Sequence, residues 1–127
     1  MLTNGFAGKI LYVDLTTGKV DYQPVTEELA RTWFGGRGLG VKVLYDLVPP
    51  DADAESPDNA VVVSAGTFVG TIYPASCRVD LITRSRRGAM VTSSSGTFGV
   101  NMKSAGYDVI AITGRSPSPV YLRIKDD

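Results

Sequence analysis

Two segments of this sequence gather glycine, serine and arginine in patterns that suit a phosphate-bearing ligand. The first, residues 35–40, is a glycine-rich run that contains Arg37 and Gly38. The second, residues 78–106, holds five basic residues, one acid and a hydroxyl-rich run at 92–99. Glycine lets backbone approach a ligand closely, and the planar guanidinium of arginine matches phosphate oxygens. Together the segments predict a surface for a phosphate-bearing cofactor, without specifying which cofactor.

The run at residues 35–40 lies between two predicted helices. It does not follow a strand, as the dinucleotide-binding fingerprint does, and it lacks the Gly-Lys-Ser/Thr of a P-loop. One interpretation is structural: one helix ends, the chain turns and another helix begins. The functional interpretation places Arg37 and Gly38 at an anion, close to the N-terminal amides of the second helix. Both interpretations remain open at this point.

Arg78 opens a predicted strand two residues before Asp80. It either pairs with Asp80 or a loop acid, or it binds a phosphate or a polar heterocycle. A second stretch just before a predicted helix consists of Ser93, Ser94, Ser95 and Gly96. Hydroxyls and free amides at a helix start attract anions. Serine caps are also common in ordinary helices, so this stretch fits either a cap or a cofactor contact.

Composition excludes several classes of function. The chain has 127 residues, enough for one domain over residues 1–127, and its net charge is +0. That balance provides no global field for nucleic acid or an anionic membrane. With one cysteine and no histidine, the chain cannot by itself build a disulfide, a Cys/His zinc site, an iron–sulfur cluster or a histidine-dependent triad. It shows no membrane-spanning run and no signal peptide, so we expect a cytoplasmic location.

The periodicity predicts an α+β fold that is β-rich, mostly antiparallel and has about three short helices. The helices are expected after Thr26, from about Gly38 to the prolines at 49–50, and over residues 98–105. The strands are expected at residues 9–15, 20–22, 60–64, 79–83, 89–92, 108–113 and 120–125.

Several side chains carry structural expectations. Trp33, Phe34 and Tyr45 are expected in the core, and Cys77 is expected to be buried or half-buried. The acids of the loop at residues 51–59 and the arginines of the turn at 86–87 are expected to face solvent. The longer loop at residues 66–75 is turn-rich.

Taken together, the sequence resembles the N-terminal domain of the tungsten-containing aldehyde ferredoxin oxidoreductases. The match is carried in order by residues 8–11, 13–18, 35–40, 44–46, 56–59, 65–66, 70–71, 96–99, 103–108, 114 and 119–121. Because these motifs cover essentially the whole chain with similar spacing, the resemblance is far more specific than any one of them.

The resemblance implies a β-rich base on which a tungsten (or molybdenum) bis-pterin lies. It implies that Arg78 and the loop of Ser93 to Gly96 contact the phosphate region, where magnesium links the two pterins. Ser93 is then expected as a backbone ligand of that magnesium. The family commonly has Asn-Ser-Gly-Gly in this loop, whereas this chain has Ser93-Ser94-Ser95-Gly96. A backbone carbonyl ligand would survive that change, and a side-chain amide contact would not.

The resemblance further implies that this chain is one part of a larger enzyme. The intact enzyme would oxidise an aldehyde to its acid and pass electrons through a 4Fe-4S cluster, which this chain does not ligate, to ferredoxin. No catalytic acid or base is expected here. Alternatives are a relative acting on another substrate class, such as an aryl thioester, or a non-catalytic nucleotide- or partner-binding module. We expect the isolated chain to self-associate and to lack redox activity.

Overall fold

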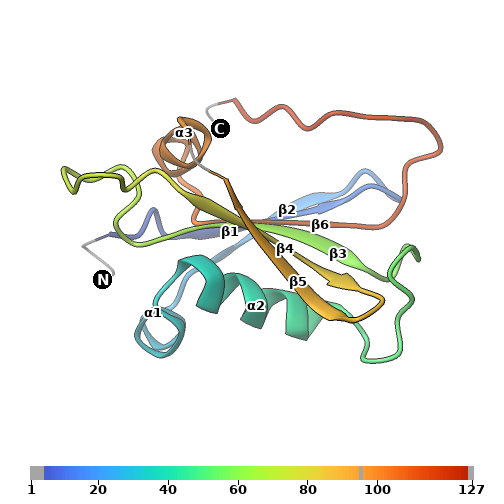
Figure 1. The fold of residues 1–127 in the computed structure, drawn as a ribbon. Coiled ribbons are helices and arrows are strands. Elements are labelled where there is room, and N and C mark those ends of the chain that lie inside the picture. Colours follow the sequence, from blue (N-terminus) through green and yellow to red (C-terminus); the bar gives the residue numbers. More distant parts are fainter. Residues whose placement is uncertain (1–4, 95, 126–127) are drawn as a thin grey trace.

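The computed structural model describes residues 5–94 and 96–125 (Figure 1). Within these residues, six strands form one sheet in the order β2-β1-β6-β3-β4-β5. They are β1 (Lys9–Asp14), β2 (Val20–Pro24), β3 (Ala60–Ala65), β4 (Val79–Ser85), β5 (Gly88–Ser94) and β6 (Val109–Thr113). Only β1 and β6 pair in parallel, while the other neighbours are antiparallel. The predicted mostly antiparallel α+β fold is therefore confirmed.

Three helices follow from the local signals that predicted them. In α1 (Glu27–Trp33), Thr26 Oγ1 accepts a hydrogen bond from the Leu29 amide at 3.2 Å and caps the first turn. The helix α2 (Gly36–Leu47) begins two residues earlier than expected, at Gly36 rather than Gly38. The third helix, α3 (Phe98–Ser104), ends before Gly106. Its position agrees with the prediction.

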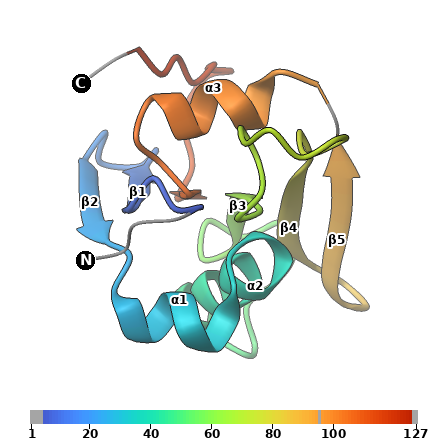
Figure 2. The same ribbon diagram turned by 90° about the vertical axis from the view of Figure 1, so that its left-hand side faces the viewer.

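The helices cover opposite faces of the sheet, α1 and α2 on one and α3 on the other (Figure 2). Side chains alternate between the faces along each strand. In β1, for example, Ile10 packs into the cluster on the α2 face and Leu11 into the cluster on the α3 face. The strands β3 and β6 lie in the middle of the sheet and carry the most buried residues.

Two structural expectations were wrong. Residues 120–125 are not part of any strand in the described structure. The aromatic group lies at the surface and not in the core: Phe34 is 73% exposed and Tyr45 81%. Trp33 is 37% exposed at the end of α1. Phe34 is the C-cap of α1 in a left-handed conformation, and Tyr45 lies in α2 next to the buried Leu44, so both rings point away from the sheet.

Candidate functional site

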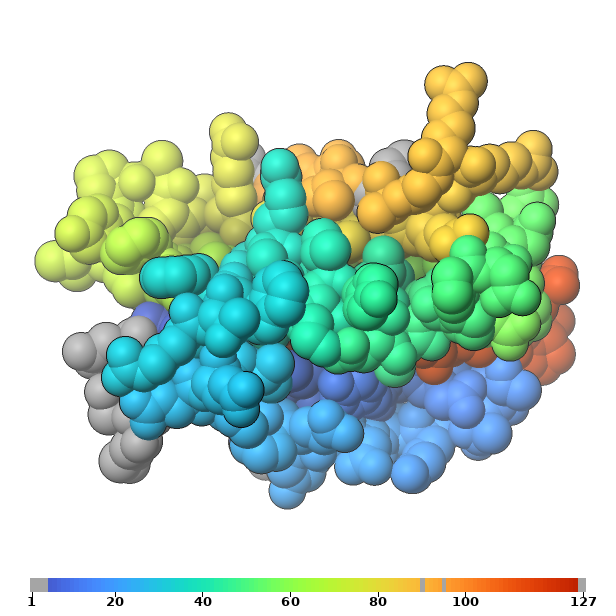
Figure 3. All heavy atoms as spheres, turned by 90° about the horizontal axis from the view of Figure 1, so that it is seen from below, coloured from blue at the N-terminus to red at the C-terminus, as the bar shows by residue number. Residues whose placement is uncertain are grey.

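The predicted site residues that the structure describes lie at the end of the sheet where several elements meet. The start of α2, the loop at residues 66–78, the start of β4 and the end of β5 converge there (Figure 1). An isolated antiparallel bridge between Gly35 and Gly66 ties the turn before α2 to this loop. Seen from the side of α1 and α2, the loop extends beyond the helices (Figure 3). Segments 30 or more residues apart in the sequence thus share one surface.

An open pocket of about 410 Å³ lies at this junction. Most of its lining is loop backbone and aromatic or small side chains, with two charged groups: Phe34, Gly66, Thr67, Phe68, Val69, Tyr73, Pro74, Ala75, Ser76, Arg78 and Asp80. The rings of Phe68 and Tyr73 lie 4.8 Å apart on one wall. Small-molecule sites are usually hollows of this kind, mostly apolar and with a few charged groups.

A polar network beside the pocket joins α2, β4 and β5. Arg37 Nη2 donates to Asp80 Oδ1 and to Ser93 Oγ, each at 3.4 Å. The Ser93 hydroxyl also donates to Asp80 Oδ1. Asp80 and Ser93 face each other across the β4–β5 register, so the sheet itself places them together. The structure therefore brings together two predicted site residues, Arg37 and Ser93, through a carboxylate that was not a predicted site residue.

This network bears on one of the two interpretations of Arg78. Among the described residues, the ion-pair partner of Asp80 is Arg37, and Arg78 forms no ion pair or hydrogen bond. The alternative in which Arg78 pairs with Asp80 or a loop acid is therefore not formed among the described residues, and its cofactor contact stays a prediction. Arg78 lines the pocket with a guanidinium that the described protein groups leave unengaged.

The glycines at the start of α2 have packing reasons. A Cβ at Gly38 would lie 2.3 Å from the carbonyl oxygen of Trp33, and one at Gly36 would lie 3.3 Å from Gly66 Cα. Gly36 also has a φ of 53°, which other residues adopt with strain. Gly38 thus packs against the end of α1, and its predicted cofactor contact remains a prediction.

The serine run is split by the end of the sheet. Ser93 and Ser94 belong to β5, Ser95 lies outside the described residues, and Gly96 has a φ of 131°. Thr97, not a serine, is the N-cap residue of α3, and its side chain makes no capping hydrogen bond. The predicted serine cap is therefore absent from the described part of the run. Of the two described serines of the run, Ser93 alone makes side-chain hydrogen bonds, through its hydroxyl.

Lys103, a base of the second predicted cluster, is turned inward. Its ammonium lies 3.4 Å from Asp108 Oδ1 and donates to the carbonyl of Gly5. Burial lowers the pKa of Lys103, and the nearby Asp108 carboxylate partly offsets that effect. Asp108 also accepts the amides of Ala7 and Gly8 at 2.9 and 2.6 Å. Lys103 therefore holds residues 5–8 in place rather than facing a ligand.

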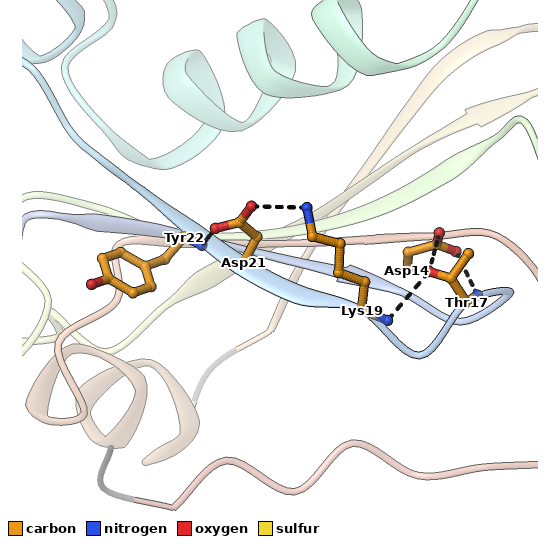
Figure 4. Close-up of polar contacts among 5 residues, drawn as sticks. All are labelled: Asp14, Thr17, Lys19, Asp21 and Tyr22. Atoms are coloured by element: carbon orange, nitrogen blue, oxygen red, sulfur yellow. Dashed lines mark hydrogen bonds and ion pairs between the residues drawn. The ribbon is translucent and has the colours of Figure 1, made fainter.

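Other polar clusters are remote from the pocket. In the β1–β2 hairpin, Asp14 accepts hydrogen bonds from Thr16 and Thr17, and Lys19 pairs with Asp21 (Figure 4). Arg86 pairs with Glu55 in an exposed contact at the β4–β5 turn, as expected for a solvated turn. Cys77 is half-buried, as predicted.

Two features are absent from the described residues, a metal-binding cluster and a membrane-spanning helix. In these residues, no group of three or more His, Cys, Asp or Glu side chains lies close enough together to hold a metal ion. None of the helices described is both long and apolar enough to span a membrane. The predicted cytoplasmic location stays a prediction.

Comparison with known proteins places this geometry in a family. A family model described as "Aldehyde ferredoxin oxidoreductase, N-terminal domain" matches residues 10–127. The tungsten-containing aldehyde ferredoxin oxidoreductase of Thermococcus kodakarensis is 39% identical over 122 residues, which are 94% of this chain and 20% of that protein. The "aliphatic sulfonate oxidoreductase, WOR-like subunit" of Pyrococcus furiosus is 34% identical over 127 residues, covering 96% of this chain and 20% of that protein.

A solved structure agrees with these matches. The active-site complex BamBC of benzoyl coenzyme A reductase, in complex with 1,5-dienoyl-CoA, superposes with a TM-score of 0.86 and 31% identity. The match covers 90% of this chain and 18% of that chain. This chain thus spans about a fifth of the length of its relatives. It belongs to the aldehyde ferredoxin oxidoreductase family, in which it corresponds to the N-terminal domain.

Proposed function

We propose that this chain is the cofactor-supporting N-terminal part of a tungsten bis-pterin oxidoreductase. The complete enzyme would oxidise an aldehyde to its carboxylic acid and pass two electrons through a 4Fe-4S cluster to ferredoxin. One observation carries the proposal. Arg78 lines a pocket at the junction of α2, β4 and β5, while the neighbouring carboxylate, Asp80, is paired with Arg37.

The residues present fit a phosphate-bearing cofactor. A guanidinium with no ion-pair partner among the described residues is the group that matches phosphate oxygens. Phe34, Phe68 and Tyr73 add apolar walls on which a flat ring system can rest. Since the Ser93 hydroxyl is taken by Asp80, Ser93 would contribute a backbone carbonyl to a pterin-bridging magnesium. This fits the sequence change in the loop, because only a side-chain contact would be lost.

The roles of this chain would be binding and orientation. The tungsten pterin, when bound, supplies the redox chemistry. Arg78 would fix its phosphate end, and Arg37 would keep Asp80 neutralised so that no free carboxylate repels that phosphate. The chain has one cysteine and no histidine, so cluster ligands and an imidazole base would come from the rest of the enzyme.

The surface around the pocket supports a covered position in a larger protein. Phe34, Phe68, Ile72 and Tyr73 are between 58% and 101% exposed. Apolar surface of this kind usually marks an interface. We therefore propose that the remaining domains or subunit of the enzyme cover it, and that the chain alone self-associates.

The test is Arg78→Lys in the full-length enzyme, with Arg87→Lys in the exposed β4–β5 turn as the matched control. Lysine keeps the charge but loses the fork, so retention of the cofactor should weaken by about 1.5–3 kcal/mol. Tungsten per protomer should fall in the first variant and stay at the wild-type level in the second. Full tungsten content in Arg78→Lys would contradict the proposed contact.

A second candidate is a relative with another substrate class. It is favoured by the 34% identity to an aliphatic sulfonate oxidoreductase subunit and by the structural match to a benzoyl coenzyme A reductase. Assaying the full-length enzyme with aldehydes and with aryl-CoA thioesters separates the two. A full-length protein purified natively without tungsten, molybdenum or pterin would instead support the non-catalytic module.

The isolated 127-residue chain should lack redox activity, because it holds neither cluster ligands nor the whole cofactor site. Reduction of a viologen dye by an aldehyde with this chain alone would contradict that expectation.

A further inference from the structure

Asp80 lies between two serines in one row across the sheet. The strand register places it opposite Ser64 on β3 and opposite Ser93 on β5. The row is on the face covered by α2, because Ile82, two residues further along β4, packs into the cluster on that face. Ser64 is fully buried, and its hydroxyl makes no hydrogen bond in the described structure. The side-chain donors that reach the Asp80 carboxylate in the described residues are therefore those of Arg37 and Ser93.

The hairpin register fixes the direction in which the Ser93 backbone points. The β4–β5 turn has two residues, since Ser85 pairs with Gly88. In such a hairpin the closing pair is joined by backbone hydrogen bonds, and bonded and non-bonded pairs then alternate along the ladder. The pair of Asp80 and Ser93 stands five steps from the closing pair. It is therefore a pair without backbone hydrogen bonds between its members.

Asn59, which precedes β3, confirms this alternation. It accepts a hydrogen bond from the Arg84 amide at 3.3 Å and donates one to the Arg84 carbonyl at 3.0 Å. The backbone groups of Arg84 thus point to the β3 side, and so do those of Ile82 and Asp80 by the two-residue period. The amide and carbonyl of Ser93 then point away from β4. Because β5 is the last strand of the sheet in the described residues, the Ser93 carbonyl lies at an open sheet edge.

We propose that Asp80 is a positioning residue, whose carboxylate holds the Ser93 hydroxyl and thereby fixes the direction of the Ser93 carbonyl at this edge. At a pair without backbone hydrogen bonds, the side-chain bond is the direct polar link between the two strands. The use of that carbonyl by a magnesium ion rests on the proposed function, whereas its direction does not. The role of Arg37 is then to neutralise the carboxylate, which is only 18% exposed.

Hydrogen exchange of full-length variants tests the positioning. Asp80→Ala removes the acceptor of the Ser93 hydroxyl, whereas Asp80→Asn keeps an oxygen in its place. By alternation the amides of residues 92 and 94 bond to β4, and in Asp80→Ala they should exchange at least about 10-fold faster than in the wild type. Residues 88–90, at the other end of β5, should not change.

Two further variants complete this test. Ser93→Ala removes the donor and should reproduce the fast exchange of Asp80→Ala, while Asp80→Asn should stay near the wild-type rate. Asp21→Ala, in the remote β1–β2 hairpin, is the control and should leave β5 unchanged. Equal exchange at residues 92 and 94 in Asp80→Ala and Asp80→Asn would overturn the proposal, because the acceptor oxygen would then have no role.

Magnesium and tungsten contents of the same samples connect this positioning to the cofactor. Both should fall by about half or more in Asp80→Ala and in Ser93→Ala, and should be kept in Asp80→Asn. Fast exchange with full metal content in Asp80→Ala would overturn the link between Asp80 and the cofactor, and would leave the proposed function standing. A wild-type enzyme without tungsten would contradict the proposed function, and the exchange result would still uphold or overturn the positioning of Ser93.

A double variant separates the charge of Asp80 from its hydrogen bond. Arg37→Met alone should lower the tungsten content of the full-length enzyme, because it leaves the carboxylate without its cation. In Arg37→Met combined with Asp80→Asn no charge remains to be neutralised, so the tungsten content should return to the wild-type level. A loss in the double variant as large as in Arg37→Met alone would overturn this division of roles, since Arg37 would then act on the cofactor directly.

Discussion

The two faces of the sheet are closed in different ways. On one, the 12-residue α2 packs so closely that its Leu39 is fully buried, along with Val62 and Ile82 beneath it. On the other, the seven-residue α3 leaves half-buried residues at the edges of its cluster. The α2 cluster also has half-buried residues at its edge, among them Val41, Val48 and Val91. The two faces therefore differ in the length of the helix that packs on them, twelve residues against seven.

The contacts that hold each face differ in chemistry. At Gly40, α2 approaches β3 and β4 so closely that a Cβ would lie 2.3 Å from Ile82 Cδ1 and 2.8 Å from Ser64 Cβ. On the α3 side, the buried pair of Lys103 and Asp108 fixes the helix to the segment before β1. Close apolar packing dominates one face, and a buried ion pair anchors the other.

The largest expected effect comes from breaking that anchor. Lys103→Met would leave the Asp108 carboxylate, only 1% exposed, without its cation. Removing one partner of a buried pair typically costs about 3–5 kcal/mol. We expect a loss of that size in the free energy of unfolding, measured by denaturant titration. Lys19→Met, which removes an exposed pair, is the control and should cost no more than about 1 kcal/mol. Similar losses in both variants would show that Lys103 is not an anchor.

The second largest effect is expected from disturbing the close packing of α2 on the opposite face. Gly40→Ala should lower the free energy of unfolding by about 1–3 kcal/mol, because the added methyl overpacks the contact of α2 with Ser64 and Ile82. Gly66→Ala is the control, since its new Cβ would meet only Val69 at 3.8 Å. Thermal unfolding followed by circular dichroism measures both. An unchanged melting temperature in Gly40→Ala would mean that this face is less tightly packed than described.

A smaller effect is expected at the network that joins the α2 face to the pocket. Arg37→Met removes a pair whose arginine is 63% exposed, so the free energy of unfolding should fall by only about 0–1 kcal/mol. Cofactor retention in the full-length enzyme should fall nonetheless, because Asp80 would lose its cation beside the pocket. Tungsten analysis alongside a melting curve separates the two quantities. A large loss in the free energy of unfolding with normal tungsten content would show that Arg37 stabilises the fold and does not support the cofactor.

The smallest effect concerns pH and the hairpin at the far edge of the sheet. Hydrogen bonds from the Thr17 side chain and the Thr16 amide lower the pKa of Asp14 below its ordinary 3.8. The stabilisation by Asp14 is therefore present above pH 3.8 and is lost as the pH falls through the lowered pKa. The stability difference between the wild type and Asp14→Asn should be constant near neutrality and shrink below that pH. A stability difference between the wild type and Asp14→Asn that grows as the pH falls would contradict the lowered pKa of Asp14.

Local signals were enough to predict most of the fold. Thr26 with the acids after it marks the start of α1, and Thr16-Thr17-Gly18 marks the β1–β2 turn. Residue chemistry also pointed to the end of the sheet where Arg37, Arg78 and Ser93 lie. Whether they bind a cofactor is untested.

The contacts between distant segments could not be predicted. Arg37 and Asp80 are 43 residues apart, and the distance between them depends on the packing of α2 against β4. The alternative that paired Arg78 with Asp80 used sequence proximity, whereas the β4–β5 register places Ser93 opposite Asp80. Residues 120–125 failed as a strand for a related reason. A strand needs a neighbour, and its own sequence does not supply one.

The single parallel pair has a consequence for how this chain folds during synthesis. The hairpin of β1 and β2 is complete after about 24 residues, but β1 is joined to the rest of the sheet only through β6, where Ile10 faces Val109. The antiparallel strands β3, β4 and β5 form a separate unit that β6 also borders. A ribosome must therefore release residue 113 before either unit can join the other. Until then the nascent chain exposes both edges that β6 will occupy, and this late, long-range closure makes slow folding and chaperone contact the expected behaviour.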